Sequence, residues 1–117
     1  MESILTSIKG RLGFSEEYEA FDTDIIMEIN TAFFDLYRLG VGPSDGFSIE
    51  DDTSVWNDFI PVDVNTVVRE AIKTYIYLRT RLGFDPPSNT AHIQAMQRRI
   101  DQLEWTINNA AESENKV

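Results

Sequence analysis

Apolar and polar positions alternate with helical spacing over much of the chain, and the longest regular run covers residues 64–82. Apolar side chains there recur at intervals of three and four residues, which places one apolar stripe along one side of a helix. The stripe comprises Val64, Val67, Val68, Ala71, Ile72, Tyr75, Ile76, Leu78 and Leu82. A helix of this length spans about 28 Å, roughly the diameter of a small domain. We therefore expect a central helix over residues 64–82, ended by the sequence GFDPP at 83–87, along which the other segments pack.

The same spacing predicts two helices before the central one. A short helix is expected over residues 2–12, with Gly13 as its C-terminal cap. A longer helix is expected from a cap at Asp22 or Thr23 to Leu39, where glycines and a proline stop it. Its predicted inward residues are Ile25, Ile26, Ile29, Ala32, Phe33, Leu36 and Tyr37, and its predicted outward residues are Glu28, Asp35 and Arg38.

Periodicity is lost over residues 42–62, and ordered connections of this length tend to be functional. Turn-forming residues open the connection, and a single-turn helix is expected to begin at residues 50–52 and to end near Phe59. Trp56 and Phe59 are large apolar residues set among several aspartates. Two interpretations are open: they close the end of the helical core, or they form a contact for another protein chain.

A last helix is expected after the prolines at 86 and 87, with Ser88 or Asn89 as its N-cap. Its apolar positions form a narrow seam: Ile93, Met96, Ile100, Leu103, Ile107 and Ala110. Because the preceding connection is short, this seam should pack antiparallel to the central helix. Trp105 lies opposite the seam, so a third element or another chain must cover it, and the first helix is the candidate within the chain.

Together these elements predict an all-α fold, a small bundle of about five helices around the central one. A length of 117 residues fits one domain, which we place at residues 1–112, with a short flexible tail at 113–117. No stretch is long and apolar enough to span a bilayer, and none resembles a signal peptide. We therefore expect a protein made in the cytoplasm, without a membrane partner.

Charge is distributed unevenly along the chain, whose net charge is -10. Residues 1–63 carry 14 acidic and 3 basic side chains, net -11, whereas residues 64–117 carry 6 acidic and 7 basic side chains, net +1. Such an acidic protein is poorly suited to gripping nucleic acid, because affinity for phosphates comes mainly from Lys and Arg. It can still surround DNA without holding it.

Candidate catalytic and metal-binding residues are scarce. The chain has no cysteine and a single histidine, His92, which excludes disulfides, thiolate sites and a multi-histidine metal site within one chain. The acidic run at 50–52 lacks the ligand spacing of a calcium loop. Asp22 and Asp24 fit helix capping and the helix dipole better than paired-carboxylate catalysis. We therefore expect no enzymatic activity, no cofactor and no metal.

A basic row runs along the central helix, on the side away from its apolar stripe. Lys73, Tyr77 and Arg81 follow one another at intervals of four residues, with Arg69 alongside. One interpretation is a basic face in water. The other, favoured by the tyrosine in its middle, is a surface covered by the acidic half of a neighbouring subunit.

Four stretches carry a resemblance to a known family. They are FDTDIIMEINTAFFDLYRLGVGP at 21–43, WNDF at 56–59, KTYIYLRTRLGFDPP at 73–87 and LEW at 103–105. With them the chain resembles the head-tail connector proteins of tailed phages, a family of small helical ring-forming adaptors, from residue 1 to about residue 110. The FDPP element after a basic and aromatic helix is the most specific part, and none of the stretches is a catalytic signature.

The resemblance implies a structural virion protein in the phage neck, between capsid and tail. Members of the family assemble as a ring, usually of twelve subunits, that docks under the portal protein and supports the tail or a stopper protein. The ring encloses the channel through which double-stranded DNA leaves, without binding it specifically. The charge asymmetry fits this expectation, because a head-to-tail ring needs two different surfaces that match each other.

Site residues follow from the resemblance together with the residue pattern. The expected sites are a subunit interface at Arg69, Lys73, Tyr77 and Arg81, a contact to another neck component at Trp56 and Phe59, a portal contact at Trp105 and Lys116, and an acidic lumen at Glu50, Asp51 and Asp52. The alternative function is that of a small acidic regulatory protein that mimics DNA and binds a host factor. A DNA mimic would act as a monomer or dimer, whereas a connector becomes ordered as a ring on capsids.

Overall fold

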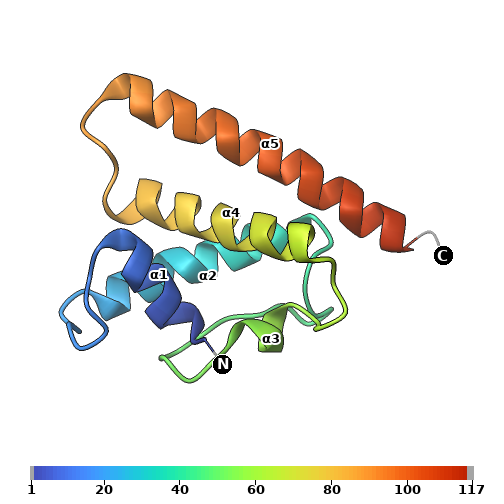
Figure 1. Ribbon diagram of the computed structural model, residues 1–117, viewed down its shortest axis with the longest axis horizontal. Helices are drawn as coiled ribbons and strands as arrows, with labels where there is room; N and C mark the ends of the chain where they lie inside the picture. Colours follow the sequence, from blue (N-terminus) through green and yellow to red (C-terminus); the bar gives the residue numbers. More distant parts are fainter. Residues whose placement is uncertain (1, 116–117) are drawn as a thin grey trace.

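A computed structural model describes residues 2–115 of the chain and the side chains as far as Ala111. This part of the chain forms five helices and no strand: α1 Ile4–Leu12, α2 Asp22–Arg38, α3 Trp56–Phe59, α4 Thr66–Phe84 and α5 Thr90–Asn115 (Figure 1). Both α2 and α5 pack on α4 and run antiparallel to it, while α1 lies across α2 and α4 on the side away from α5. The predicted all-α fold around a central helix is confirmed.

The central helix α4 is shifted by two residues from its predicted bounds. Val64, the predicted first residue, lies before the helix; Asn65 is the N-cap, and its side chain accepts a hydrogen bond from the Val67 N–H over 2.7 Å. The helix continues through Gly83 and Phe84 because only Pro86 forbids a further turn. At Gly83 a Cβ atom would meet the carboxylate end of the Glu28 side chain from α2.

Three predictions for α2 are wrong. The position before its first turn is taken by Phe21, which makes no side-chain cap, and Asp22 instead forms an ion pair with Lys9 of α1. Tyr37, predicted to point inward, is 45% exposed. Asp35, predicted to point outward, is half-buried because its carboxylate accepts a hydrogen bond from Arg79 on α4. The edge of α2 that meets α4 is therefore partly ionic.

The long connection before α4 is held to the bundle by side chains of the helices. Asn30 of α2 bonds both backbone groups of Ile49, donating to its carbonyl oxygen over 3.0 Å and accepting from its N–H over 2.8 Å. Gly42 has a φ of +96°, in the region that favours glycine. A Cβ atom at this position would lie 2.5 Å from the Phe59 ring, so a larger residue does not fit there. The short helix ends at Phe59 as predicted but begins only at Trp56, since residues 50–52 form a turn.

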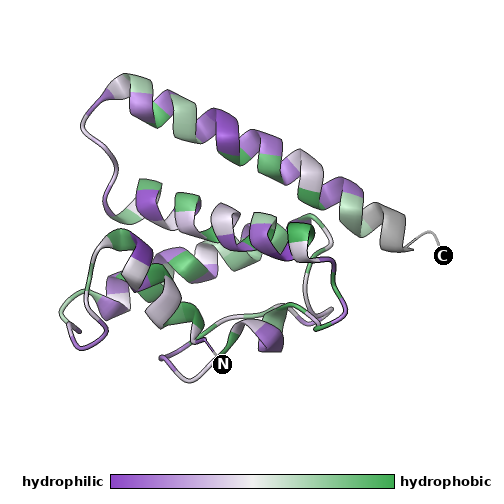
Figure 2. Ribbon diagram, in the orientation of Figure 1, coloured by the Kyte–Doolittle hydropathy of each residue, from purple (hydrophilic) through white to green (hydrophobic). Residues whose placement is uncertain are grey.

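The last helix confirms the predicted cap and seam. Asn89 accepts hydrogen bonds from the N–H groups of Ala91 and His92. Ile100 and Ile107 of the seam are fully buried, and polar and apolar residues alternate along α5 as the narrow seam requires (Figure 2). The helix continues to Asn115, whereas Lys116 and Val117 of the predicted tail lie outside the described residues.

Candidate interaction surfaces

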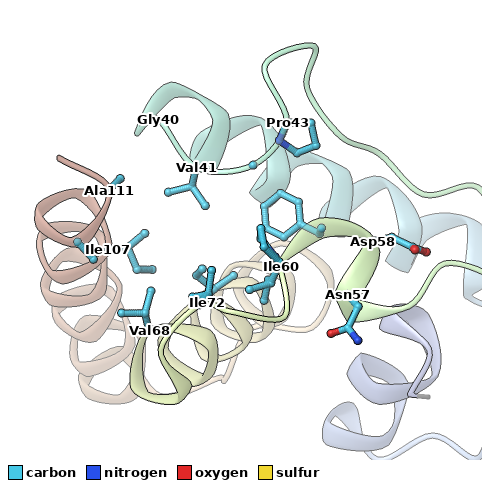
Figure 3. A pocket seen from close by; sticks show the side chains of 15 residues that line it. Gly40, Val41, Pro43, Asn57, Asp58, Ile60, Val68, Ile72, Ile107 and Ala111 are labelled. Atoms are coloured by element: carbon cyan, nitrogen blue, oxygen red, sulfur yellow. The ribbon is translucent and has the colours of Figure 1, made fainter. Parts of the chain in front are cut away.

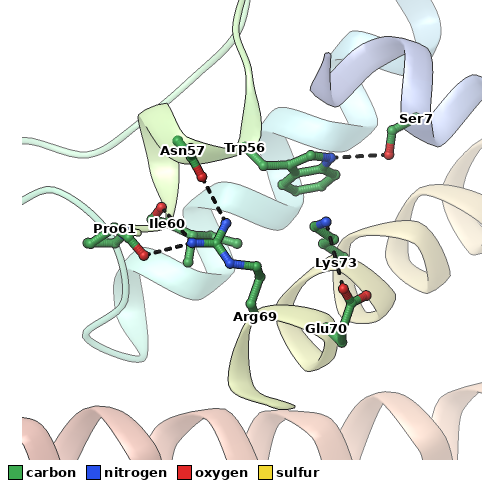
Figure 4. Close-up of polar contacts among 8 residues, drawn as sticks. All are labelled: Ser7, Trp56, Asn57, Ile60, Pro61, Arg69, Glu70 and Lys73. Carbon is green, nitrogen blue, oxygen red and sulfur yellow. Dashed lines mark hydrogen bonds and ion pairs between the residues drawn. The ribbon is translucent and has the colours of Figure 1, made fainter. Parts of the chain in front are cut away.

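The basic row of α4 begins with Arg69, whose guanidinium holds α3 and the segment after it (Figure 4). Arg69 Nη1 donates to Asn57 Oδ1 over 3.1 Å, and Nη2 donates to the Pro61 carbonyl oxygen over 2.8 Å. Hydrogen bonds that involve a charged group are stronger than neutral ones. Arg69 therefore fastens α3 to the first turns of α4, and it is half-buried as a result.

Lys73, the next residue of the row, packs against the indole of Trp56. Its ammonium lies 5.4 Å from the Trp56 ring centroid and 3.8 Å from a Glu70 carboxylate oxygen. The indole N–H in turn donates to Ser7 Oγ on α1 over 3.2 Å (Figure 4). Lys73 thus completes a contact that joins α1, α3 and α4.

The end of the row is also engaged within the chain. Arg11 of α1 lies 6.0 Å from the Tyr77 ring centroid, and Arg81 Nη1 is 3.5 Å from the Tyr77 hydroxyl. Arg81 Nε donates to the Asp85 carbonyl oxygen over 2.6 Å, which holds the turn after α4. The expectation that this side of α4 is left uncovered by its own fold is wrong, because α1 and α3 occupy it. A contact of the same residues with a neighbouring subunit stays a prediction.

Trp56 and Phe59 belong to the core. They are only 4% and 3% exposed, and the Phe59 ring packs 4.6 Å from that of Phe33 between ring centroids. Their burial supports the interpretation that they close the end of the helical core. A contact of this loop with another neck component stays a prediction.

An apolar pocket of about 390 Å³ opens at the end of the bundle where four segments meet: the one after α2, α3 with the residues after it, the start of α4 and the last turns of α5 (Figure 3). Its walls include Val41, Phe59, Ile60, Val68, Ile72 and Ile107. Asp58 and Asn57 of α3 lie at its side. The sequence gives no sign of this pocket, because its walls come from four separate segments.

The side of α5 that bears Trp105 is exposed, although the first helix was expected to cover it. Trp105 is 70% exposed, so α1 does not cover it, contrary to the candidate contact within the chain. Arg98 and Arg99 are also exposed, and within the described residues neither makes an ion pair. We call these exposed residues the α5 outer face: Arg98 and Trp105, seven residues apart, share the side of the helix opposite the seam, and Arg99 lies at the edge of that side. A contact of Trp105 with the portal protein stays a prediction, and Lys116 lies outside the described residues.

A second exposed surface, which sequence reasoning missed, lies at the connector between α1 and α2. Phe14, Tyr18, Phe21 and Phe84 form a cluster with ring centroids 5.5 to 6.0 Å apart. Tyr18 and Phe21 remain 46% and 39% exposed. The spacing of the aromatic residues at 14, 18 and 21 was the available signal, and Phe84 supplies the fourth ring from the FDPP element.

Carboxylates surround this aromatic cluster. Glu16, Glu17 and Glu19 are exposed, and within residues 2–115 no cation pairs with their side chains. Lys9 of α1 holds the segment between α1 and α2 in place. Its ammonium lies 2.9 Å from Asp22 Oδ1 and donates a hydrogen bond to the Glu16 carbonyl oxygen over 3.0 Å. We call Glu16, Glu17, Tyr18, Glu19 and Phe21 the acidic aromatic surface.

The acidic run Glu50, Asp51 and Asp52 is exposed in a turn. Asp51 accepts hydrogen bonds from the hydroxyl and the N–H of Thr53, and these bonds lower the pKa of Asp51. No group of three or more potential metal ligands is found in the part of the chain that the structure describes. The placement of these residues in a channel lumen stays a prediction.

No catalytic arrangement emerges from the most perturbed ionisable group. Burial, followed by the hydrogen bond that its hydroxyl donates to Glu104 over 2.8 Å, raises the pKa of Tyr75 far above its usual value. Tyr75 is fully buried between α4 and α5, where no substrate can reach it. Its role is to join the two helices.

Comparison with known proteins gives one positive result. The model of a family described as phage connector protein matches residues 4–114, nearly the whole chain. No curated protein and no solved structure matches. Among the described residues, no helix has the length and apolar character needed to cross a membrane. On the extent of this match, the chain belongs to the phage connector protein family.

Proposed function

We propose that the protein is a non-enzymatic adaptor that forms a ring under the portal and joins the capsid to the tail. Family membership supports the connector role. The observation that supports the ring is the pair of unlike exposed surfaces, one basic with a tryptophan on α5 and one acidic with aromatic rings beside α1. A ring of identical subunits needs two such surfaces that match each other.

The proposed ring extends the DNA exit channel. The chain has an excess of acidic residues, which supports a channel through which DNA slides, because carboxylates repel phosphates whereas Lys and Arg would retain them. The exposed carboxylates at residues 50–52 are the proposed lumen residues. The variant Glu50→Lys with Asp52→Lys, which reverses charge at this turn, should slow DNA release from otherwise complete particles.

The test uses heads that carry the portal and lack this protein. Purified protein is added, and electron microscopy with two-dimensional averaging shows whether a ring appears at the portal vertex and how many subunits it has. A ring at the portal, followed by attachment of tails, is the expected result. Binding of the protein to a basic host protein, with heads left unchanged, would instead favour the DNA-mimic function.

A further inference from the structure

We infer that neighbouring copies join through the α5 outer face of one copy and the acidic aromatic surface of the next. This inference rests on the proposed ring and names the two surfaces that build it. Trp105 with Arg98 and Arg99 would lie against the carboxylates and rings around Tyr18. The partner is thus a second copy of this chain.

The α5 outer face has the composition of an interface centre. Tryptophan, tyrosine and arginine are the residues most enriched where binding energy concentrates. A tryptophan with 70% exposure leaves a large apolar area in water unless another chain covers it. The seam of α5 is already used against α4, so the other side of the helix is available for this contact.

Charge complementarity favours the acidic aromatic surface of a second copy as the partner of the α5 outer face. Arg98 and Arg99 make no ion pair within the described residues and outnumber Asp101, the exposed carboxylate one turn from Arg98; they would meet three glutamates that also lack an ion pair there. Arginine also packs on the faces of aromatic rings, and Tyr18 and Phe21 offer such faces. Both charge and ring chemistry therefore match across the proposed contact.

The two surfaces lie at opposite edges of the subunit. Figure 1 shows α5 along one edge and the connector after α1 at the other, with α4 between them. Surfaces on opposite edges produce head-to-tail association, which closes into a ring or extends into a filament. The acidic surface is also preorganised, because Lys9 and the stacked rings hold the connector in place.

Other exposed apolar groups fit this partner less well. Met27 and Phe34 form an exposed strip on α2, but the charges beside it, Asp24 and Arg38, sum to zero. The two arginines of the α5 outer face, together with Asp101, instead leave that face with one net positive charge. The pocket near Ile107 is flanked by Asp58 and offers a single carboxylate. The portal protein is the remaining alternative occupant of the α5 outer face, and the experiment below separates it from a second copy.

The experiment reverses charge on each surface separately and then on both. Arg98→Glu with Arg99→Glu, and Glu16→Arg with Glu17→Arg, should each reduce the rings formed on portal-bearing heads by about tenfold or more. The chain that carries all four changes should regain rings, because its two surfaces match again with reversed signs. Asp45→Arg with Asp63→Arg is the control for acid reversal, since both residues are exposed elsewhere. Circular dichroism confirms that each variant is folded.

Cysteine cross-linking reads the contact directly, because the natural chain has no cysteine. Trp105→Cys combined with Tyr18→Cys should give a ladder of linked copies on heads, and either change alone should give none. The inference is overturned if the four-change chain forms no more rings than its parents, or if residue 105 links only to the portal. If the wild-type protein forms no ring on heads, the proposed function fails instead.

Discussion

The basic row of α4 and the outer face of α5 have similar compositions and opposite environments. Each combines positive side chains with an aromatic residue on the side of a helix away from its apolar stripe. On α4, the partners come from α1 and α3, so Arg69 and Lys73 stabilise the subunit. On α5, no described element covers Trp105. Helical periodicity identifies a face, whereas the path of distant segments decides whether that face stays free.

The two tryptophans of the chain give the largest test of this comparison. Trp56→Ala should lower the free energy of unfolding by about 3–5 kcal/mol, because it removes a fully buried ring and leaves a cavity. Trp105→Ala should change it by less than about 0.5 kcal/mol, because the indole is in water. Urea unfolding of the isolated subunit measures both. Equal effects would mean that Trp105 is covered within the subunit.

Lys9 provides the next test, since it is a cation used inside the fold. Lys9→Met should lower the free energy of unfolding by about 3 kcal/mol, because it leaves the Asp22 carboxylate without its partner in a largely buried place. Asp22→Asn in addition to Lys9→Met should recover part of the loss. A loss below about 0.5 kcal/mol would place the ammonium in water.

Arg69 on α4 and Arg98 on α5 test the same comparison with smaller expected changes in the free energy of unfolding. Arg69→Ala should lower the free energy of unfolding by about 1–2 kcal/mol, through the lost hydrogen bonds to Asn57 and Pro61. Arg98→Ala should change it by less than about 0.5 kcal/mol. The same urea experiment serves both variants, and a reversed order would contradict the assignment of inner and outer faces.

The smallest expected effect concerns Tyr75 and pH. Its raised pKa means that the folded state holds the neutral phenol after an unfolded tyrosine has ionised, so stability is fully present below about pH 10 and decreases above it. The decrease due to this residue is at most about 1.4 kcal/mol per pH unit. Tyr75→Phe should cost about 1 kcal/mol at pH 7 and flatten the alkaline decrease. An unchanged slope would show that Tyr75 is accessible to water.

Local sequence signals predicted the fold well where a single segment determines the outcome. Helix periods, the Asn89 cap and the α5 seam needed only neighbouring residues. The failures involve partners distant in sequence: Asp22 pairs with Lys9 instead of capping α2, and Asp35 turns inward to Arg79. Local sequence patterns do not predict such ion pairs, because the pairs depend on how separate helices pack against each other.

The candidate sites were predicted less completely for the same reason. Trp105 was recognised as needing a cover, since its position opposite the seam is a local property. The basic row was expected to be uncovered within the subunit, because the pattern does not show that residues 54–61 return to α1 and α4. That return includes the hydrogen bond from the Ile4 N–H to the Ser54 carbonyl oxygen. The acidic aromatic surface was missed because Phe84 joins it from another helix.

The central claim is that copies meet through the outer face of α5, while Arg69 of the basic row holds α3 within each subunit. A cryo-electron microscopy map of the assembled neck, at a resolution that shows side chains, tests it most directly. The expected map shows Trp105 against Tyr18 and the neighbouring glutamates of the next copy, with Arg69 still bound to Asn57 of its own chain. Trp105 in water, or in contact with the portal alone, would contradict it.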